Sequence, residues 1–438
     1  MKKIRNIYIS CSKIEKAILC ASFIIALFAA MFFCHRDSCE AIIPWGLDFI
    51  RTVKSGRVLD YYYQVRGIGM YNILVICISA LWQLPMFIIL RLFNIELYVV
   101  YVVWWKCFLI LILILNCYIL GSILKILKCD HKTIFTGVLA YILSPITLWG
   151  NIAMGQIDTI ATLFILLAIF YFIKNKYHKM CLFASVAITF KIIPIVLFVP
   201  IIIIVSKKIK ELVLYFVELV FLPILIEYLS RCIGGYVETK NTFGLSLIYE
   251  NNYNYTNIFI CSMIVLYVIS YACNDGDKKK AFLFATIAYV IFLLNVSFHP
   301  QWVIYILPFL IILSTYIIDN FISVMLIFCT NLGYIMFVIS LWEYKVDNYM
   351  VNNGILPYIF GYKYNGKTLW QTILVDISFG KSLFIAGIIS IIVLSNISNT
   401  TKRVLFKEDV IGEYLCYFIC SIPSILIILS SFILYFNI

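Results

Sequence analysis

Three short polar segments and one lysine carry the side chains of this chain that could do chemistry. The segments are residues 35–40, 155–158 and 297–301, and the lysine is Lys191. Each interrupts a long apolar sequence, where ionisable and polar groups are costly and therefore often functional. Together they offer carboxylates for a general base, a cation for a phosphate, and amide groups for sugar hydroxyls.

The first segment contains Asp37, which we predict to be the catalytic carboxylate. At a membrane boundary, partial loss of water raises the pKa of a carboxyl group toward the range of a working base. The alternative is a solvated residue that pairs with Arg36. Glu40 and Asp48 are competing acids, but the apolar spacing of residues 44–50 predicts an interfacial helix that turns Asp48 toward water.

The second segment contains Gln156 and Asp158. Asp158 begins an apolar run, so it either interacts with unsatisfied backbone N–H groups at a helix start or belongs to a site. A buried amide such as that of Gln156 suits sugar hydroxyls, which favours the second interpretation slightly.

Lys191 and His299 are the candidate phosphate ligands. Lys191 lies roughly ten residues from the basic clusters on either side, so its ammonium group cannot easily reach their surface. It therefore needs an anionic partner, either a lipid phosphate or one of Glu218 and Glu227. His299 is either a second phosphate donor or a loop histidine fixed by Pro300.

The amino-acid composition indicates that most of the folded chain is surrounded by lipid rather than by water. The chain is 63% hydrophobic and only 13% charged, whereas soluble domains carry about 25% charged residues. Its net charge of +12 comes from basic clusters between apolar runs, which indicates membrane topology rather than nucleic-acid binding. No CxxC pair occurs among the 15 cysteines, although Cys34 and Cys39 could meet outside the membrane.

The basic clusters also set the expected topology, because such clusters stay in the cytoplasm. We expect a cytoplasmic N-terminus, a first span at 17–34, and an external loop over residues 35–97. Keeping the cluster at 125–132 inside requires that residues 70–93 do not cross. We interpret that run as an interfacial or re-entrant helix pair broken near Pro85.

The remaining apolar runs predict the other spans and one re-entrant hairpin. Between basic clusters at 174–179 and 207–210 we expect two half-depth helices with residues 191–194 at their tip. The other expected spans are 99–124, 134–150, 157–173, 211–229, 257–273, 281–296, 302–318, 321–342, 379–395 and 414–436. The fold class is thus an all-α polytopic membrane protein of about 11–13 transmembrane helices. It forms one integral domain, residues 1–438, in the cell membrane.

The order of five short motifs carries a resemblance to a known family. The motifs are Asp37 after the first span, Pro44-Trp45, Gly155-Gln156-Ile157-Asp158, Lys191-Ile192-Ile193-Pro194, and His299-Pro300-Gln301 before an apolar span. This pattern resembles the glycosyltransferase-C superfamily, particularly bacterial relatives of the GPI mannosyltransferases. The resemblance covers residues 1–320, and residues 321–438 match only as additional helices. The chain departs from the pattern at residues 61–67, where the family often has a Tyr-Pro-Pro-rich stretch, and after Asp37, where Ser-Cys replaces a second acid.

The resemblance implies a hexosyltransferase that moves a mannose- or glucose-type sugar from a polyprenyl-phosphate donor to an acceptor hydroxyl, with inversion, on the extracytoplasmic face. It implies that Asp37 is the base. We expect the donor phosphate to contact Lys191, Arg66 and His299. We expect the sugar or acceptor to contact Gln156, Asp158, Glu40 and Trp45.

The expected partners follow from that activity. They are a lipid-linked sugar donor, a glycan or glycolipid acceptor and membrane lipid, without nucleic acid. No cofactor is expected beyond the donor, and a divalent metal at Asp37 and Glu40 stays open, since two carboxylates make a poor site.

Two other classes remain open. A lipid-linked glycan polymerase or ligase would also act outside, and Arg231 and Lys240 in loop 230–256 fit its basic external loop. A flippase or transporter would need a polar path through the bilayer, for which the sequence offers only Lys191, Glu218 and Glu227.

Overall fold

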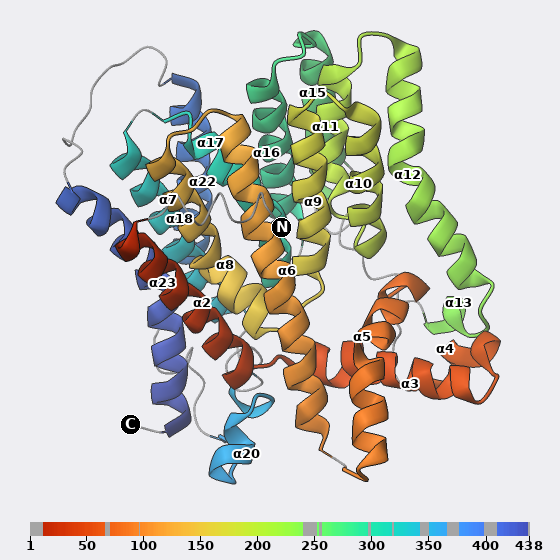
Figure 1. Cartoon of the computed structure of the whole chain (residues 1–438). Coiled ribbons are helices and arrows are strands. Elements are labelled where there is room, and N and C mark those ends of the chain that lie inside the picture. The colour runs from red at the N-terminus through yellow and green to blue at the C-terminus, as the bar shows by residue number, and fades with distance from the viewer. Residues whose placement is uncertain are drawn as a thin grey trace.

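The structure, a computed structural model, describes residues 12–65, 71–95, 97–239, 252–253, 256–296, 299–317, 319–341, 350–365, 376–397 and 410–436. Nearly all regular structure in these residues is helical, as Figure 1 shows. The two strands there have two residues each, β1 (Asn252–Tyr253) and β2 (Thr256–Asn257), and pair antiparallel. The expected all-α polytopic membrane fold is confirmed.

The first half of the described chain contains a bundle helix, a connecting segment and a series of further helices. The bundle helix is α2 (Lys13–Phe32), and the connecting segment holds η1 (Asp37–Ile42), α3 (Ile43–Lys54), η2 (Val58–Asp60), α4 (Tyr61–Gln64) and α5 (Ile73–Leu92). The helices that follow are α6 (Tyr98–Ile126), α7 (His131–Ile142), α8 (Pro145–Thr147), η3 (Leu148–Ala153), α9 (Asp158–Ile173), α10 (Tyr177–Phe190), α11 (Ile195–Val205), α12 (Ile209–Arg231) and α13 (Tyr236–Thr239).

The second half completes the bundle. Its helices are α15 (Ile258–Ala272), α16 (Lys278–Asn295), η4 (Pro300–Tyr305), α17 (Leu307–Ser314), α18 (Asn320–Leu341), α20 (Leu356–Phe360), α22 (Ile377–Ile397) and α23 (Val410–Phe436). Most of the spans expected from apolar runs coincide with one of these helices to within a few residues.

Eight helices among the described residues are long and apolar enough to cross a membrane. The expected number was about 11–13. The difference lies in shorter apolar helices, which are Asp158–Ile173, Ile195–Val205, Ile258–Ala272 and Pro300–Ser314. Helices α10 and α11 are the two short helices predicted for the hairpin, with 14 and 11 residues and Lys191 between them.

The connections rich in lysine gather at one end of the bundle, which we call the basic end. In Figure 1 the α6–α7, α9–α10, α11–α12 and α15–α16 connections all lie toward the top. Three contacts tie these connections to one another or, for His131, to the start of α2. They are His131 with Glu15, Lys278 Nζ donating to the Ile173 carbonyl, and Asn274 donating to the Ser206 carbonyl.

Helix α5 corrects one expectation. Residues 73–92 form a single helix that contains Pro85, rather than a pair broken there. Helix α5 packs against both α3 and α6, and it continues through Pro85 without the backbone hydrogen bond that proline cannot make. The hairpin with α6 is held by stacked Trp82 and Trp104, whose indole N–H groups each donate to the other's carbonyl.

Two hydrogen bonds at the start of α5 position this helix along the length of the bundle. The Asn72 side chain donates to the carbonyl of Thr189, near the tip of α10, and Ile73 N donates to Ser230 Oγ. The helix then runs away from the basic end, and α3 lies crosswise beside it (Figure 1). Residues 35–65 and 71–95 therefore lie at the end opposite the basic one.

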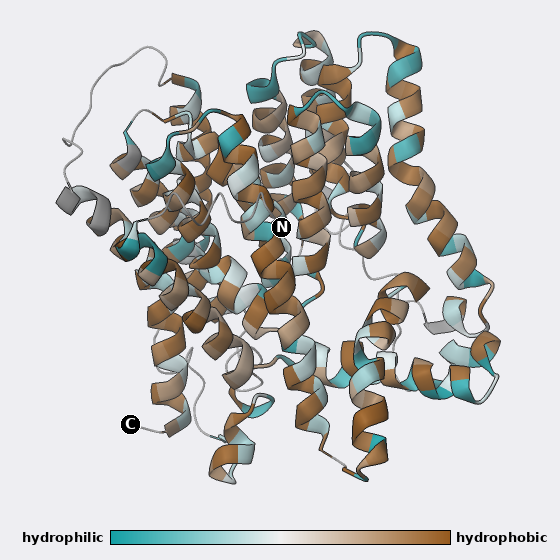
Figure 2. Cartoon of the chain, viewed as in Figure 1, coloured by the Kyte–Doolittle hydropathy of each residue, from teal (hydrophilic) through white to brown (hydrophobic). Residues whose placement is uncertain are grey.

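Hydropathy and packing agree with lipid as the solvent. Helix α12 stands at the edge of the bundle (Figure 1) and is coloured largely as hydrophobic in Figure 2. Apolar side chains of α12 and α15 are exposed, among them Phe221 and Val268, at 62% and 63%. Inside, small residues let helices approach: a Cβ at Gly333 would overlap the Phe384 backbone, and one at Gly387 would overlap Thr330. Close contact at glycine is how membrane helices gain packing without a hydrophobic driving force.

Candidate functional site

The candidate site lies where several short elements end inside the bundle. Helix α9 starts at Asp158, and α10 ends one residue before Lys191. At about 1.5 Å per residue, 16 and 14 residues give these helices lengths of about 24 and 21 Å from the basic end. The polar side chains at their inner ends therefore lie deep in the apolar bundle.

Lys191 and Asp158 form an ion pair at this level. Lys191 Nζ lies 3.4 Å from Asp158 Oδ2, and the two side chains are 15% and 0% exposed. The Tyr305 hydroxyl donates to the other carboxylate oxygen, Oδ1. A buried charge pair needs further hydrogen bonds to offset the loss of water, and Tyr305 supplies one of them from η4.

Aromatic rings surround the ammonium group of Lys191. Its Nζ lies 5.7 Å from the centre of the Tyr71 ring and 5.8 Å from that of Trp302. Both distances suit a cation–π contact. His299 packs on Trp302 with ring centres 4.2 Å apart and ring planes tilted by 37°, so the third polar segment lies beside the same cation.

Asp37, which lies in η1, is close enough to Lys191 for their charges to interact. His35 Nδ1 lies 3.5 Å from Asp37 Oδ2, and the side chains are 5% and 44% exposed. Burial raises the pKa of Asp37, but the hydrogen bond with His35 and the charges of Lys191 and Arg36 outweigh it, so the pKa is below its ordinary value. Asp37 is thus a carboxylate at neutral pH, and no raised pKa of a working base is found.

His299 is held neutral. Burial and the charge of Lys191 lower the pKa of His299 to about 4, with the charge of Asp37 opposing them. A neutral imidazole can still accept or donate one hydrogen bond.

Two buried hydrogen-bond donors in the segments that hold Asp158 and Trp302 have no partner in the described part of the chain. They are Gln156 Nε2, on a side chain 1% exposed, and Trp302 Nε1. A buried polar atom without a partner costs about 1–3 kcal/mol, so such atoms in a native site call for an explanation.

Residues 152–155 hold the first and second polar segments together. Ser38 Oγ donates to the Met154 carbonyl, and buried Lys106 donates to the carbonyls of Ile152 and Ala153. Gly155 adopts φ +81°, and a Cβ there would lie 2.8 Å from Ser38 Oγ. Glycine is needed here for both the conformation and the close approach. Elements η1 and η3 are both π-helical, a geometry that often marks functional segments.

Of the other predicted site residues, Glu40 and Trp45 contact residues other than Lys191 and Asp158. Glu40 pairs with Arg36 at 3.6 Å and its side chain is 64% exposed. Trp45 is 7% exposed and packs its ring against Tyr71 at 5.9 Å, in a small cluster with Tyr61. Arg66 lies outside the described residues. The roles predicted for these residues stay untested.

The structure corrects one interpretation of the sequence. The protein partner of Lys191 is Asp158, while Glu218 pairs with His178 and Glu227 with Arg231. Asp158 lies in the first turn of α9 and also belongs to the ion pair, so its two predicted roles do not exclude each other. Tyr61 and Tyr62 are core residues, 0% and 1% exposed.

Sequence reasoning missed Tyr71, Trp302, Tyr305 and Lys106. The aromatic residues carry no local signal among 17% aromatic residues, and Lys106 lies inside an apolar run read simply as a span. No group of three His, Cys, Asp or Glu side chains that could hold a metal occurs among the described residues.

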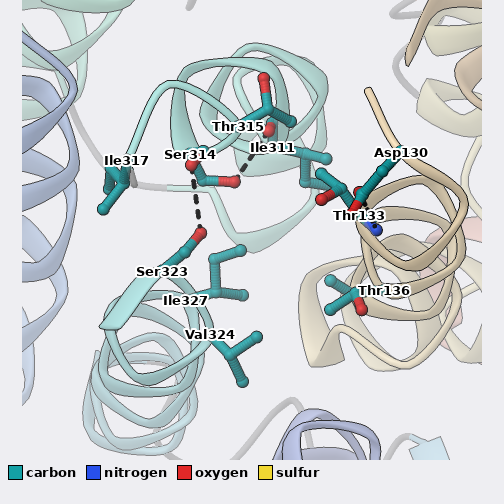
Figure 3. A pocket seen from close by; sticks show the side chains of 12 residues that line it. Asp130, Thr133, Thr136, Ile311, Ser314, Thr315, Ile317, Ser323, Val324 and Ile327 are labelled. Atoms are coloured by element: carbon teal, nitrogen blue, oxygen red, sulfur yellow. Dashed lines mark hydrogen bonds between the residues drawn. The ribbon is translucent and has the colours of Figure 1, made fainter. Parts of the chain in front are cut away.

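A hollow of about 230 Å³ lies elsewhere, between α7, α17 and α18. Figure 3 shows the hydroxyl groups that line it, including those of Thr136, Ser314 and Ser323. Asp130, also on its wall, caps α7 at the basic end, so this hollow is separate from the Lys191 group.

Comparison with known proteins identifies the family. The family model of the GPI transamidase subunit PIG-U matches residues 60–301, more than half of the chain. This match includes Gln156, Asp158, Lys191 and His299 and begins after Asp37. No curated protein matches the chain.

The match corrects the functional expectation. A glycosyltransferase-C identity, hexosyl transfer from a polyprenyl-phosphate donor and the alternatives of a glycan polymerase or flippase were wrong, because the matched family is described as a transamidase subunit. The motifs that suggested them are short: Lys191, for example, is explained by its pair with Asp158. The chain is a multi-pass membrane protein, and it belongs to the PIG-U family of GPI transamidase subunits.

Proposed function

We propose that this protein is a binding subunit of a membrane complex, and that the Lys191–Asp158 group holds the polar head of a phosphate-bearing glycolipid. The observation that carries the proposal is the ion pair at the inner ends of short helices, 15% and 0% exposed in an otherwise apolar bundle. A lipid can enter between membrane helices, and its head would then meet this group.

The hydrogen-bonding groups favour such a head. Lys191, Gln156 Nε2 and Trp302 Nε1 are donors, which suit phosphate oxygens. Asp37, whose side chain is 44% exposed, is an acceptor for sugar hydroxyls. A glycosylphosphatidylinositol carries both kinds of group, and the name of the family points to this class of lipid.

Charge balance favours the same ligand over a simple anion. Lys191 faces two carboxylates, Asp158 and Asp37, so the group does not concentrate positive charge. A free phosphate would be attracted weakly, whereas a head with a phosphate and several hydroxyls can satisfy donors and acceptors together. Aromatic rings of Tyr71 and Trp302 add surfaces on which sugar rings pack.

The proposed orientation puts the N-terminus and the basic end in the cytoplasm, with the site open to the extracytoplasmic face of the cell membrane. The clustering of lysine-rich connections at one end supports it through the positive-inside rule. A single cysteine introduced at Lys176, in a cysteine-free background, should react with an impermeant maleimide only after the membrane is opened. Labelling in intact cells would contradict the orientation.

Lipid binding is tested on the purified full chain by native mass spectrometry. Short-chain glycosylphosphatidylinositol is compared with phosphatidylinositol and with a neutral glycosyl diacylglycerol. We expect the first to bind most tightly. The double variant Lys191→Met/Asp158→Asn, which leaves no unpaired charge, should weaken its binding by about tenfold or more, as expected for a lost hydrogen bond to a charged group.

The matched control is Lys278→Met. Lys278 Nζ donates to a backbone carbonyl at the basic end, so this variant removes one lysine without touching the site. Equal binding of the glycolipid by the double variant and the control would refute the proposal. Equal binding of all three lipids by the native protein would also refute it.

A further inference from the structure

Two cysteines flank the segment that carries His35 and Asp37. Cys34 follows α2, and Cys39 lies in η1. Their sulfur atoms are 2.9 Å apart, and the two residues are 0% and 8% exposed. Both are thiols in this structure. Two sulfur atoms in contact across so short a loop need only a small further approach to reach the bond length of about 2 Å in a disulfide.

The backbone around both cysteines is held in place. Cys34 N donates to the Met350 carbonyl at 3.0 Å, and the Tyr98 hydroxyl donates to the Cys39 carbonyl. Gly354 approaches the end of α2 so closely that a Cβ there would overlap the Phe32 carbonyl. The sulfur contact is therefore built into the packing of α2, α6 and residues 350–354.

The surroundings favour a reactive thiol. Burial raises the pKa of Cys34, but the hydrogen bond from Cys39 and the positive charge of Lys106 outweigh it and lower the pKa below its usual value. Lys106 is fully buried, and the ionised thiol is the nucleophile in thiol chemistry.

A path to the pair exists. A hollow of about 350 Å³ is lined by Cys39 together with Tyr98 and Asn353. It lies at the end opposite the basic one, where η1 and the start of α6 meet. A reagent in this hollow can contact Cys39, whereas Cys34 does not line the hollow and is 0% exposed.

We propose that Cys34 and Cys39 form a redox modification site, in which their oxidation to a disulfide ties together the segment that carries Asp37. The inference rests on the orientation given under the proposed function, because the extracytoplasmic side is the one where disulfides persist. It does not depend on the identity of the lipid.

The oxidant is a disulfide-bearing thiol oxidoreductase of that compartment. Cys39 gives its proton to the hydrogen-bonded Cys34 sulfur, and Cys39 Sγ attacks one sulfur of the oxidant's disulfide. This forms a mixed disulfide and releases the oxidant's other sulfur, which takes up a proton as the first thiol. Cys34, deprotonated again, then attacks Cys39 Sγ, and the oxidant sulfur that was bound to Cys39 leaves as the second thiol. The two cysteines lose two electrons and two protons, and the oxidant's disulfide gains them as two thiols.

The test is differential alkylation of the full chain, isolated from cells in the presence of an excess of alkylating reagent. We expect the peptide with residues 34 and 39 to be unalkylated and lighter by two hydrogen atoms, and to gain two labels after reduction. Reduction should also lower the melting temperature of the native protein, and it should not change that of Cys39→Ser. The control Cys117→Ser, which alters a buried cysteine of α6 away from this segment, should keep the response to reductant.

A fully alkylated, reduced pair in freshly isolated protein would overturn the proposal. So would a melting temperature that responds equally to reductant in the native protein and in Cys39→Ser. If the pair is reduced while the introduced cysteine at Lys176 reports the expected orientation, the redox proposal alone fails. If the pair is oxidised while glycolipid binding is absent, the proposed function alone fails.

Discussion

The ion pair between Lys191 and Asp158 gives the sharpest prediction on stability. Its atoms are 3.4 Å apart and its side chains are 15% and 0% exposed. Lys191→Met leaves the Asp158 carboxylate buried with only the Tyr305 hydroxyl as a hydrogen-bond donor, and stranding a buried charge costs about 3–5 kcal/mol. Asp158→Asn leaves an ammonium group that is partly accessible, so we expect about 2 kcal/mol.

The double variant separates the pair from the packing. With both charges removed, the amide oxygen introduced by Asp158→Asn can still accept from Tyr305, and replacing a buried pair by neutral groups is often close to neutral. We expect the double variant to be more stable than Lys191→Met, with a coupling energy of at least about 2 kcal/mol.

The assay is thermal unfolding of the four proteins in one detergent, followed by the amount of monodisperse protein after heating. The expected order of melting temperatures is native, then the double variant, then Lys191→Met. A double variant that loses as much stability as the two single variants combined would refute the reasoning, because the two side chains would then contribute independently.

Three further predictions follow from neighbouring contacts. The pKa of His299 is about 4 in the fold and about 6.5 in an unfolded chain, so the unfolded chain binds more protons between these values, and stability should fall as the pH drops from 6.5 to 4. His299→Gln should remove this part of the acid sensitivity when melting is measured as a function of pH. Identical pH profiles of the native protein and the variant would contradict the prediction. Gly155→Val should destabilise by about 1–3 kcal/mol or more, because φ is +81° and Ser38 Oγ is in the way, and a native melting temperature would argue against the packing described. Gly387→Val should separate α18 from α22 and lower the yield of folded protein, whereas Ile389→Val, at an exposed position of the same helix, should not; equal yields would count against this interface.

Most of the fold could be predicted from the sequence, because the backbone can adopt few conformations inside a lipid bilayer. An apolar run in a bilayer must be helical, so apolar runs and basic clusters placed most helices and the short pair around Lys191. Pro85 was misread as a break, since the sequence does not reveal that α3 and α6 both pack against α5.

The site was only partly readable. Lys191 stood out because a lysine far from either surface needs a partner, but the identity of that partner depends on how α9 and α10 pack. From their positions in the sequence, Glu218 and Glu227 were equally plausible partners of Lys191. In the structure Glu218 pairs with His178 and Glu227 with Arg231. Tyr71, Trp302 and Tyr305 could not be selected, since aromatic residues are frequent throughout the chain.

The function was misjudged for a related reason. Short motifs such as Gly-Gln-x-Asp and Lys-x-x-Pro reflect local structural requirements. These are a positive φ at Gly155, a buried ion pair and the start of a helix after Pro194. Several kinds of membrane protein can share these requirements. The family match over residues 60–301 draws on many more positions and therefore outweighs them.

The most direct test of the central claim is photo-crosslinking with a glycosylphosphatidylinositol analogue that carries a diazirine in its head, followed by mapping of the labelled peptides. We predict labels in the segments that hold Asp37, Asp158 and Trp302, reduced by an excess of unmodified lipid and lost in Lys191→Met/Asp158→Asn but not in Lys278→Met. Labels confined to the outward faces of α12 and α15, or unchanged in the double variant, would contradict a headgroup site at Lys191.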